Sequence, residues 1–305
     1  MKIRAAAAAS AAALIMAAVY IVISRAPAEK AESRDVILDF SVNDVTRAEF
    51  DLQENSYSLV KADSEWKIEG IDADTDEGAV NGFFGDTLPM EGKRINNPEE
   101  PSAYGFDNPR ARVEYTFADG KKKQITLGAN TPSDTEAYVT DGKDIYTVYT
   151  QVSNALSSKM YSFIDSFIAG YEYEKTISLE ITNSTGRYTL FHSNGKWTYA
   201  ETGQPADEFQ IKSKITRYLG GIYMLRCYVK NNENMQKYGF DQSSGSLKIK
   251  LSDNTESVIR TGMTDGNELY IIIDEKPFIY CVDGSCFSFL AGDEERQRID
   301  RYGKE

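Results

Sequence analysis

The sequence Tyr104-Gly105-Phe106-Asp107 returns 134 residues later as Tyr238-Gly239-Phe240-Asp241. Further matches keep an offset of 131 ahead of this block and of 134 behind it: Trp66 with Trp197, Tyr57 with Tyr188, Leu88 with Leu219, Gly128 with Gly262, and Leu156 with Leu290. A period near 130 residues is too long for a solenoid, whose repeats run to roughly 20–50 residues, and has the size of a domain or half-domain. The sequence therefore predicts two tandem homologous domains.

Each copy begins with short runs in which apolar and polar residues alternate, as they do in half-buried strands. In the first copy, residues 45–52 and 57–60 lead into Glu65-Trp66-Lys67-Ile68. Asp76 then caps a segment with the apolar spacing of a helix face, and Asp207 does so in the second copy. We expect an antiparallel meander followed by one amphipathic helix in each copy.

A second group of strands follows the Tyr-Gly-Phe-Asp block. Residues 112–117 and 123–127 flank Asp119-Gly120, which predicts a tight hairpin because both turn residues tolerate positive φ. Further strands are predicted over residues 136–139, 145–148, 247–251 and 256–260, and a short apolar helix over 152–156. The predicted fold class is α+β, with each domain a mainly antiparallel sheet carrying one or two packed helices.

The chain divides into five predicted segments. They are a signal anchor or transmembrane helix over residues 1–25, a polar tether over 26–40, repeat domain 1 over 41–165, repeat domain 2 over 171–290, and a charged tail over 291–305.

The first segment predicts export. Lys2 and Arg4 precede nineteen uncharged residues, 5–23. These can span a hydrocarbon core of roughly 30 Å, and they exceed the roughly 7–15 residues of a cleavable signal core. The preferred interpretation is a retained single-pass anchor in the cell membrane, with the bulk of the chain extracytoplasmic because the bases precede the span. Cleavage near Ala28 would instead give a secreted protein. No Cys follows the apolar run, which argues against a lipoprotein.

The charge of the chain excludes some partners. The net charge is −13, and the first 25 residues carry three bases and no acids, so the remainder has 31 bases, 47 acids and a net charge of −16. Such a surface repels nucleic acid and anionic lipid headgroups. Hydrophobic content of 41% and charged content of 27% are those of a folded domain.

The three cysteines leave alternatives open. Cys281 and Cys286 bracket Asp283-Gly284, and a two-residue hairpin there would bring the two sulfurs within reach of a disulfide. Cys286 also aligns with Val152 of the first copy, so Asp283 is alternatively the cap of a closing helix. Cys227 has no Cys counterpart and is interpreted as a small buried apolar residue.

Two parts of the sequence carry candidate chemistry. The carboxylates of 72–78 invite a Ca²⁺ hypothesis, but glycine stands at the seventh position instead of the sixth and Phe83 at the twelfth, where a bidentate Glu belongs. Capping of the following helix explains these acids better. His192, the single histidine, corresponds to Lys61 and is predicted to lie at a solvated strand edge. The sequence predicts no catalytic, cofactor-binding or metal-ligating residues and no cofactor.

The repeated aromatic positions have a structural and a functional interpretation. A turn exposing Tyr104 and Asp107 could bind a ligand. The preferred interpretation is that Tyr and Phe fill the core, Gly takes positive φ, and Asp bonds its own turn. Trp66 and Trp197, at the ends of alternating strands, are interpreted as core anchors and not as sugar-stacking platforms.

The pattern of these motifs resembles a known family. The N-terminal span, the Trp at the end of a hairpin, the Asp-started helix, Tyr104 to Pro109 and Leu127-Gly128 together resemble the uncharacterised domain-of-unknown-function family numbered 4340, over roughly residues 40–290. The second copy departs from it, with Gln242-Ser243 after Asp241 and Thr261-Gly262 in place of Leu-Gly. The resemblance implies bacterial proteins, often with tandem copies, encoded beside ABC-type transporters related to gliding motility. It implies no catalytic residues.

These observations predict a non-enzymatic, membrane-anchored extracytoplasmic protein that binds or scaffolds. The expected partner is a membrane protein complex, with an ABC transporter permease as the candidate that the resemblance implies. The alternative is a solute or cell-wall glycan binding protein that uses the groove between the domains and the tyrosines Tyr171, Tyr173 and Tyr199. A third possibility, a hydrolase, needs two carboxylates converging in a pocket.

Overall fold

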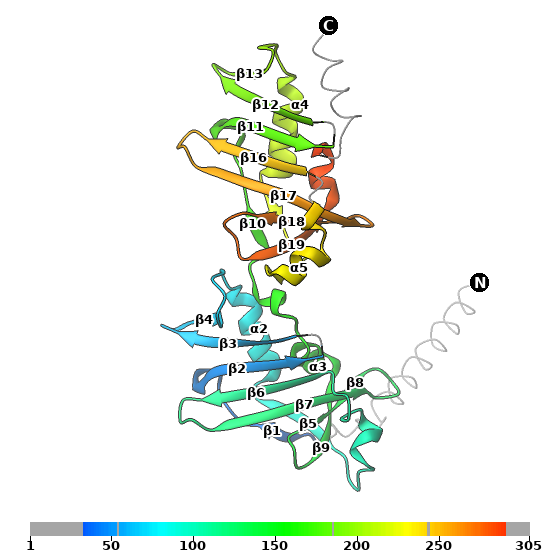
Figure 1. The fold of residues 1–305 in the computed structure, drawn as a ribbon. Coiled ribbons are helices and arrows are strands. Elements are labelled where there is room, and N and C mark those ends of the chain that lie inside the picture. Colours follow the sequence, from blue (N-terminus) through cyan, green and yellow to red (C-terminus); the bar gives the residue numbers. More distant parts are fainter. Residues whose placement is uncertain (1–32, 54, 185, 243–244, 291–305) are drawn as a thin grey trace, which may run out of the picture.

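The chain folds into two antiparallel sheets that lie one above the other in Figure 1. The computed structural model describes residues 33–290 apart from 54, 185, 243 and 244. The predicted anchor over 1–25 and the tail over 291–305 therefore lie outside the described residues. Residues 26–32 of the predicted tether also lie outside them. None of the helices in the described part is long and apolar enough to cross a membrane.

The first sheet has nine strands in the order β1-β5-β9-β8-β7-β6-β2-β3-β4. Their bounds are β1 Asp35–Leu38, β2 Val45–Leu52, β3 Ser56–Ala62, β4 Glu65–Ile68, β5 Met90–Arg94, β6 Ala111–Phe117, β7 Lys122–Asn130, β8 Glu136–Thr140 and β9 Ile145–Tyr149. The helices of this half are α2 Glu77–Thr87 and α3 Thr150–Leu156, with 3₁₀ turns η1 Val42–Asp44, η2 Pro101–Tyr104 and η3 Met160–Phe163.

The second sheet has eight strands in the order β13-β12-β11-β16-β17-β18-β19-β15. Their bounds are β11 Thr176–Asn183, β12 Gly186–Ser193, β13 Lys196–Tyr199, β15 Arg226–Val229, β16 Gly245–Leu251, β17 Glu256–Asp265, β18 Glu268–Ile273 and β19 Phe278–Asp283. A separate pair joins β10 Phe167–Ala169 to β14 Ile222–Tyr223. The remaining elements are α4 Glu208–Lys214, its π-helical continuation η5 Ile215–Leu219, α5 Asn232–Lys237, and the short turns η4 Tyr173–Lys175, η6 Phe240–Gln242 and η7 Gly284–Leu290.

The strand orders of the two sheets correspond. Starting from β4 in one and β13 in the other, the same succession of antiparallel neighbours leads to β5 and β15. Two strands that the sequence patterns did not predict correspond as well: β1 pairs with β5 through Val36 and Glu91, and β10 pairs with β14 through Phe167 and Tyr223. Val36 and Phe167 are separated by the same 131 residues as the other matched positions. Strand β1 lies within the predicted tether, and β10 lies between the two predicted domains.

The helix caps follow the prediction. The Asp76 carboxylate accepts the N–H of Ala79 at 2.9 Å, and that of Asp207 accepts the N–H of Gln210 at 3.0 Å. These bonds satisfy N–H groups that have no partner within the first turn of a helix. Helix α2 then buries Val80, Phe83, Phe84 and Thr87 against the first sheet.

The Tyr-Gly-Phe-Asp block follows its structural interpretation in part: its tyrosine is buried in both copies, as predicted, whereas its phenylalanine is half-buried and its aspartate is exposed. Gly105 and Gly239 both have φ of +79°. A Cβ on Gly128 would lie 2.1 Å from the carbonyl oxygen of Tyr104. In the second copy, a Cβ on Gly262 would lie 2.3 Å from the carbonyl oxygen of Tyr238. The block and the later glycine recur together because each needs the other's backbone to approach closely.

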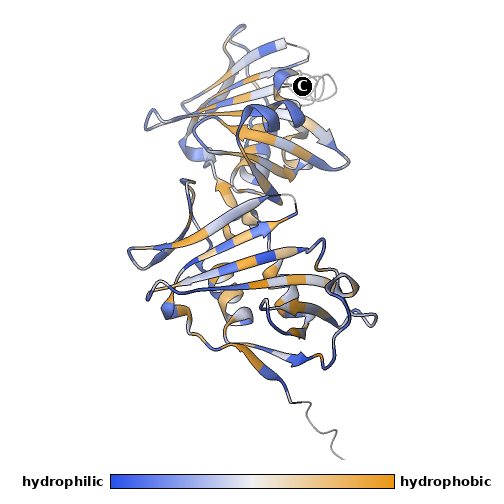
Figure 2. Cartoon of the chain, turned by 60° about the horizontal axis from the view of Figure 1, so that its bottom comes forward, coloured by the Kyte–Doolittle hydropathy of each residue, from blue (hydrophilic) through white to orange (hydrophobic). Residues whose placement is uncertain are grey.

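The two tryptophans are core residues, as predicted. Trp66 is 9% exposed and its ring centroid lies 4.6 Å from that of Phe84. Trp197 is 1% exposed, and its indole N–H donates to the hydroxyl of Tyr173 at 3.2 Å. Buried residues of both sheets form one continuous hydrophobic cluster that includes the segment between them. Apolar and polar residues alternate along the strands, as Figure 2 shows.

One sequence-based placement is wrong. His192 does not lie at a solvated strand edge, because β12 is paired on both sides and the ring is half-buried. The imidazole stacks on Trp197 at 4.8 Å, and Nδ1 lies 3.2 Å from the carbonyl oxygen of Thr176. Its counterpart Lys61 likewise lies over the Trp66 ring, at 5.9 Å.

The cysteines are free thiols. Cys227 and Cys281 are buried and Cys286 is partly exposed. Asp283 accepts the N–H of Ser285 at 2.9 Å at the start of η7, which is the alternative that the repeat favoured over a hairpin disulfide. The buried Cys227 also agrees with its predicted role as a small apolar residue.

Candidate functional site

Backbone hydrogen bonds join the loop ahead of α2 to the segment between the two sheets. The carbonyl oxygen of Phe163 accepts the N–H of Asp76 at 2.9 Å, and the N–H of Asp165 donates to the carbonyl oxygen of Asp74 at 3.1 Å. Between these bonds, Thr75 and Ile164 form an isolated antiparallel bridge. The loop ahead of α2 is therefore fixed to the junction between the two sheets.

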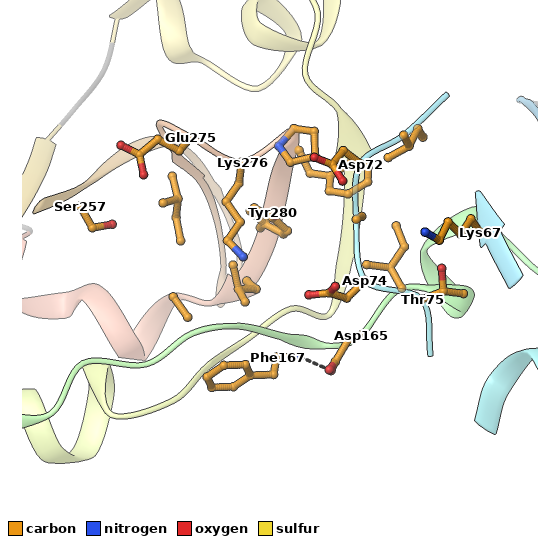
Figure 3. A pocket seen from close by; sticks show the side chains of 18 of the residues that line it. Lys67, Asp72, Asp74, Thr75, Asp165, Phe167, Ser257, Glu275, Lys276 and Tyr280 are labelled. Carbon is orange, nitrogen blue, oxygen red and sulfur yellow. Dashed lines mark hydrogen bonds between the residues drawn. The ribbon is translucent and has the colours of Figure 1, made fainter. Parts of the chain in front are cut away.

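A cavity of about 730 Å³ lies beside this junction. We call it the junction groove. Its lining comes from the first half (65–67, 71–75 and 77), from the junction (164, 165, 167–169 and 171), and from the second half (255–257, 273, 275–278 and 280). Figure 3 shows Asp72, Asp74 and Lys67 on one side and Ser257, Glu275 and Tyr280 on the other.

The groove carries an excess of negative charge. Seven carboxylates line it, Glu65, Asp72, Asp74, Glu77, Asp165, Glu256 and Glu275, against two ammonium groups, Lys67 and Lys276. Glu256 is paired with Lys248 at 2.6 Å, and the Asp165 carboxylate accepts the N–H of Phe167 at 2.9 Å. The other five carboxylates form no ion pair with any residue that the structure describes. A cationic ligand would therefore be attracted to the groove.

The aromatic residues of the groove differ from those expected. Of the three tyrosines predicted to line it, Tyr171 does so, and its hydroxyl lies 2.7 Å from that of Ser257. Burial raises the pKa of Tyr171. Tyr173 packs against Trp197 instead, and Tyr199 is part of β13 in the second sheet. The exposed ring is Phe167, 46% accessible, which meets Tyr223 edge-on at 5.6 Å.

Strand β4 forms one wall of the groove and is the last strand of its sheet. The N–H of Glu69 donates to the carbonyl oxygen of Ser58, and β4 pairs with β3 in a continuous antiparallel register. Because bonded and non-bonded residues alternate along such a pair, the N–H and C=O of Trp66 point away from β3. The outer side of β4 thus presents main-chain groups toward the groove.

The corresponding edge in the second sheet is closed. The N–H of Ala206 donates to the carbonyl oxygen of Trp197 at 2.9 Å. The N–H of Tyr199 donates to the carbonyl oxygen of Gln204, also at 2.9 Å. The loop ahead of α4 therefore covers β13. Its counterpart ahead of α2, where Thr75 replaces Ala206, bonds to the junction instead and leaves β4 uncovered.

A polar atom without a partner lies in the same loop. The hydroxyl oxygen of Thr75 is buried and makes no hydrogen bond with the described residues, and Thr75 lines the groove. Buried hydroxyl groups normally find a partner, so this hydroxyl is an exception among the described residues.

The acidic run 72–78, considered above for Ca²⁺, separates into two roles. Asp76 caps α2, whereas Asp72 and Asp74 line the groove. Within the described residues, no three or more His, Cys, Asp or Glu side chains converge in a way that could hold a metal ion. The groove offers attraction of positive charge by its carboxylates and main-chain hydrogen bonding along β4.

Comparison with known proteins identifies the family of the chain. No curated protein and no solved structure matches the chain. The family model described as "Domain of unknown function (DUF4340)" matches residues 66–228. This match covers more than half of the chain, and it runs from Trp66 in β4 across the junction to Tyr228 in β15. The chain belongs to the DUF4340 family.

Proposed function

We propose that this protein is a non-enzymatic binding subunit of the cell envelope that contacts a membrane protein complex through the junction groove. Residues 1–25 hold it at the membrane with the two sheets outside the cytoplasm. The observation that carries the proposal is the groove itself, where five carboxylates lack an ion-pair partner within the described part of the chain. An ABC-type transporter is the complex that the family resemblance implies.

The charge of the groove favours a protein partner. Unpaired carboxylates at an interface steer the approach of a positively charged surface and fix its orientation. A neutral glycan would instead need flat aromatic platforms. Tyr173 and Tyr199, which could have supplied them, are committed to packing in the second half.

Photo-crosslinking in intact cells tests this function. The side chain of Lys276 projects into the groove in Figure 3, so a photoreactive amino acid at this position reports on what occupies it. Phe209, 77% exposed on α4 and outside the groove lining, gives the matched control. We expect adducts with one membrane protein from position 276 only. Equal adducts from both positions, or none from position 276, would refute the proposal.

Glycan binding is the second candidate, because Phe167 offers one exposed ring beside carboxylates. Exposed aromatic rings next to polar groups are a common arrangement in small-molecule sites. Co-sedimentation of the protein with purified cell-wall glycan, lost in Phe167→Ala and retained in Phe191→Ala, would support this candidate over protein contact. Phe191 is the suitable control because it is 49% exposed on β12 and lies outside the groove lining.

A further inference from the structure

We propose that the junction groove binds an extended, lysine- or arginine-bearing segment of a partner protein, which adds as a strand along the outer edge of β4. This inference rests on the proposed function and names the chemistry of the partner. Two independent features carry it: an open strand edge and an excess of carboxylates.

The open edge selects a polypeptide as the occupant. The N–H and C=O of Trp66 point outward from the last strand of the first sheet. No described residue outside the sheet forms a hydrogen bond to either group. Exposed strand edges bind extended peptides through main-chain hydrogen bonds. A small cation such as a metal ion or a polyamine would leave these groups unused.

The second copy shows what such an edge accepts. In β13, the carbonyl oxygen of Trp197 receives the N–H of Ala206, which belongs to an extended segment lying antiparallel to the strand through the bridge between Thr198 and Pro205. Trp66 is the counterpart of Trp197, at an offset of 131. The partner segment takes, beside β4, the place that the protein's own loop takes beside β13.

The carboxylates select the side chains of that segment. Successive side chains of a strand point to opposite faces, so every second residue of an added strand faces the same side of the groove. Asp72 and Asp74 have this alternate spacing, and both line the groove. Lysine or arginine at alternate positions of the partner would meet them, with an aliphatic stem lying on the exposed ring of Phe167.

Peptide binding to the full-length protein in neutral detergent tests the inference. The probe is a fluorescent eight-residue peptide that alternates lysine and threonine, and binding is followed by anisotropy at low and at moderate salt. We expect binding that weakens with salt. The Asp72→Asn/Asp74→Asn variant should weaken it about tenfold, as expected for two partly exposed charge pairs. Lys276→Gln should strengthen it, because it removes a competing ammonium group.

Two controls separate the groove from general electrostatics. Glu99→Gln/Glu100→Gln removes two exposed charges of the first half outside the groove lining and should leave binding unchanged. A peptide of the same charge with N-methyl groups on alternate residues keeps the lysines and blocks strand addition, so it should not bind. Equal binding of the methylated peptide, or displacement of the probe by spermine at equal total charge, would overturn the inference.

The outcomes distinguish the inference from the proposed function. Adducts from position 276 together with failure of the lysine–threonine peptide would preserve contact through the groove and reject strand addition by a basic segment. Specific peptide binding with no adduct in cells would reject the membrane partner and retain the peptide-binding groove.

Discussion

Gly128 faces the carbonyl oxygen of Tyr104 so closely that a Cβ on the glycine would lie 2.1 Å from that oxygen. The same relationship recurs between Gly262 and Tyr238 at 2.3 Å. Both contacts are with backbone atoms, which cannot turn away as a flexible side chain can. They join the Tyr-Gly-Phe-Asp turn to β7 in the first sheet and to β17 in the second.

Gly128→Ala is expected to destabilise the protein by about 3 kcal/mol, because the added methyl group forces two backbone segments apart. Gly82→Ala is the control. No atom lies within 4 Å of a Cβ at this position in α2, so the alanine should be neutral or stabilise by about 0.5–1 kcal/mol. Urea unfolding followed by circular dichroism measures both. Equal effects of the two substitutions would contradict the close contact.

The helix caps give a second prediction. Asp76→Ala and Asp207→Ala should each lower the free energy of unfolding by about 1 kcal/mol, because each removes the acceptor for an N–H of the first turn. Asp76→Asn keeps an acceptor oxygen and should cost much less. Denaturant unfolding of the three variants checks this, and a cost for Asn equal to that for Ala would argue against capping.

The ion pair between Arg226 and Glu268 predicts a dependence on pH. Arg226 Nη1 donates to Glu268 Oε1 at 2.9 Å, and this hydrogen bond lowers the pKa of Glu268. A carboxyl whose pKa is lower in the folded than in the unfolded state stabilises the fold above the unfolded value of about 4.3 and loses that effect as the pH falls through the folded value.

Arg226→Met should therefore reduce stability most near pH 7, and the difference from the unmodified protein should shrink below about pH 4. Unfolding in urea at a series of pH values measures this difference. A gap between the two proteins that stays constant down to about pH 3 would show that Arg226 acts by packing alone.

The thiols give a fourth prediction. Burial raises the pKa of Cys227 to about 12 and that of Cys281 to about 11. Little reactive thiolate is therefore present at pH 8, and both thiols should be protected from iodoacetamide until the protein is denatured. Cys286, which is partly exposed, should react first. Mass spectrometry of the labelled protein checks the order, and a non-reduced mass about two daltons lower would reveal a disulfide instead.

Features that depend on local sequence could be predicted. The strands β2 and β4 have the bounds that alternation indicated, and Gly120 takes the positive φ expected at its hairpin. Asp76 and Asp207 cap their helices because capping involves residues only three positions apart. In these cases, the interacting residues lie within a few positions of one another in the sequence.

Features that depend on residues far away in the sequence could not be predicted. Strands β1 and β10 span four and three residues, too few for an alternating pattern, and they form because β5 and β14 are beside them. A groove between the domains was expected, but the open edge of β4 escaped prediction, because the loops ahead of α2 and α4 have similar positions in the sequence but different bonding partners. Ile164 and Asp165 draw the first loop away from β4. A signal was present in the sequence: Pro205-Ala206 stands where the first copy has Asp74-Thr75.

The continuous hydrophobic cluster has a consequence for anyone who wishes to study the halves apart. Phe163 and Ile164 are buried on one side of the junction, and Ile168 and Tyr171 on the other. A truncation between them would uncover large apolar side chains on both fragments, and such surfaces promote aggregation. Neither fragment should then stay in solution when expressed alone, and the protein is best produced undivided.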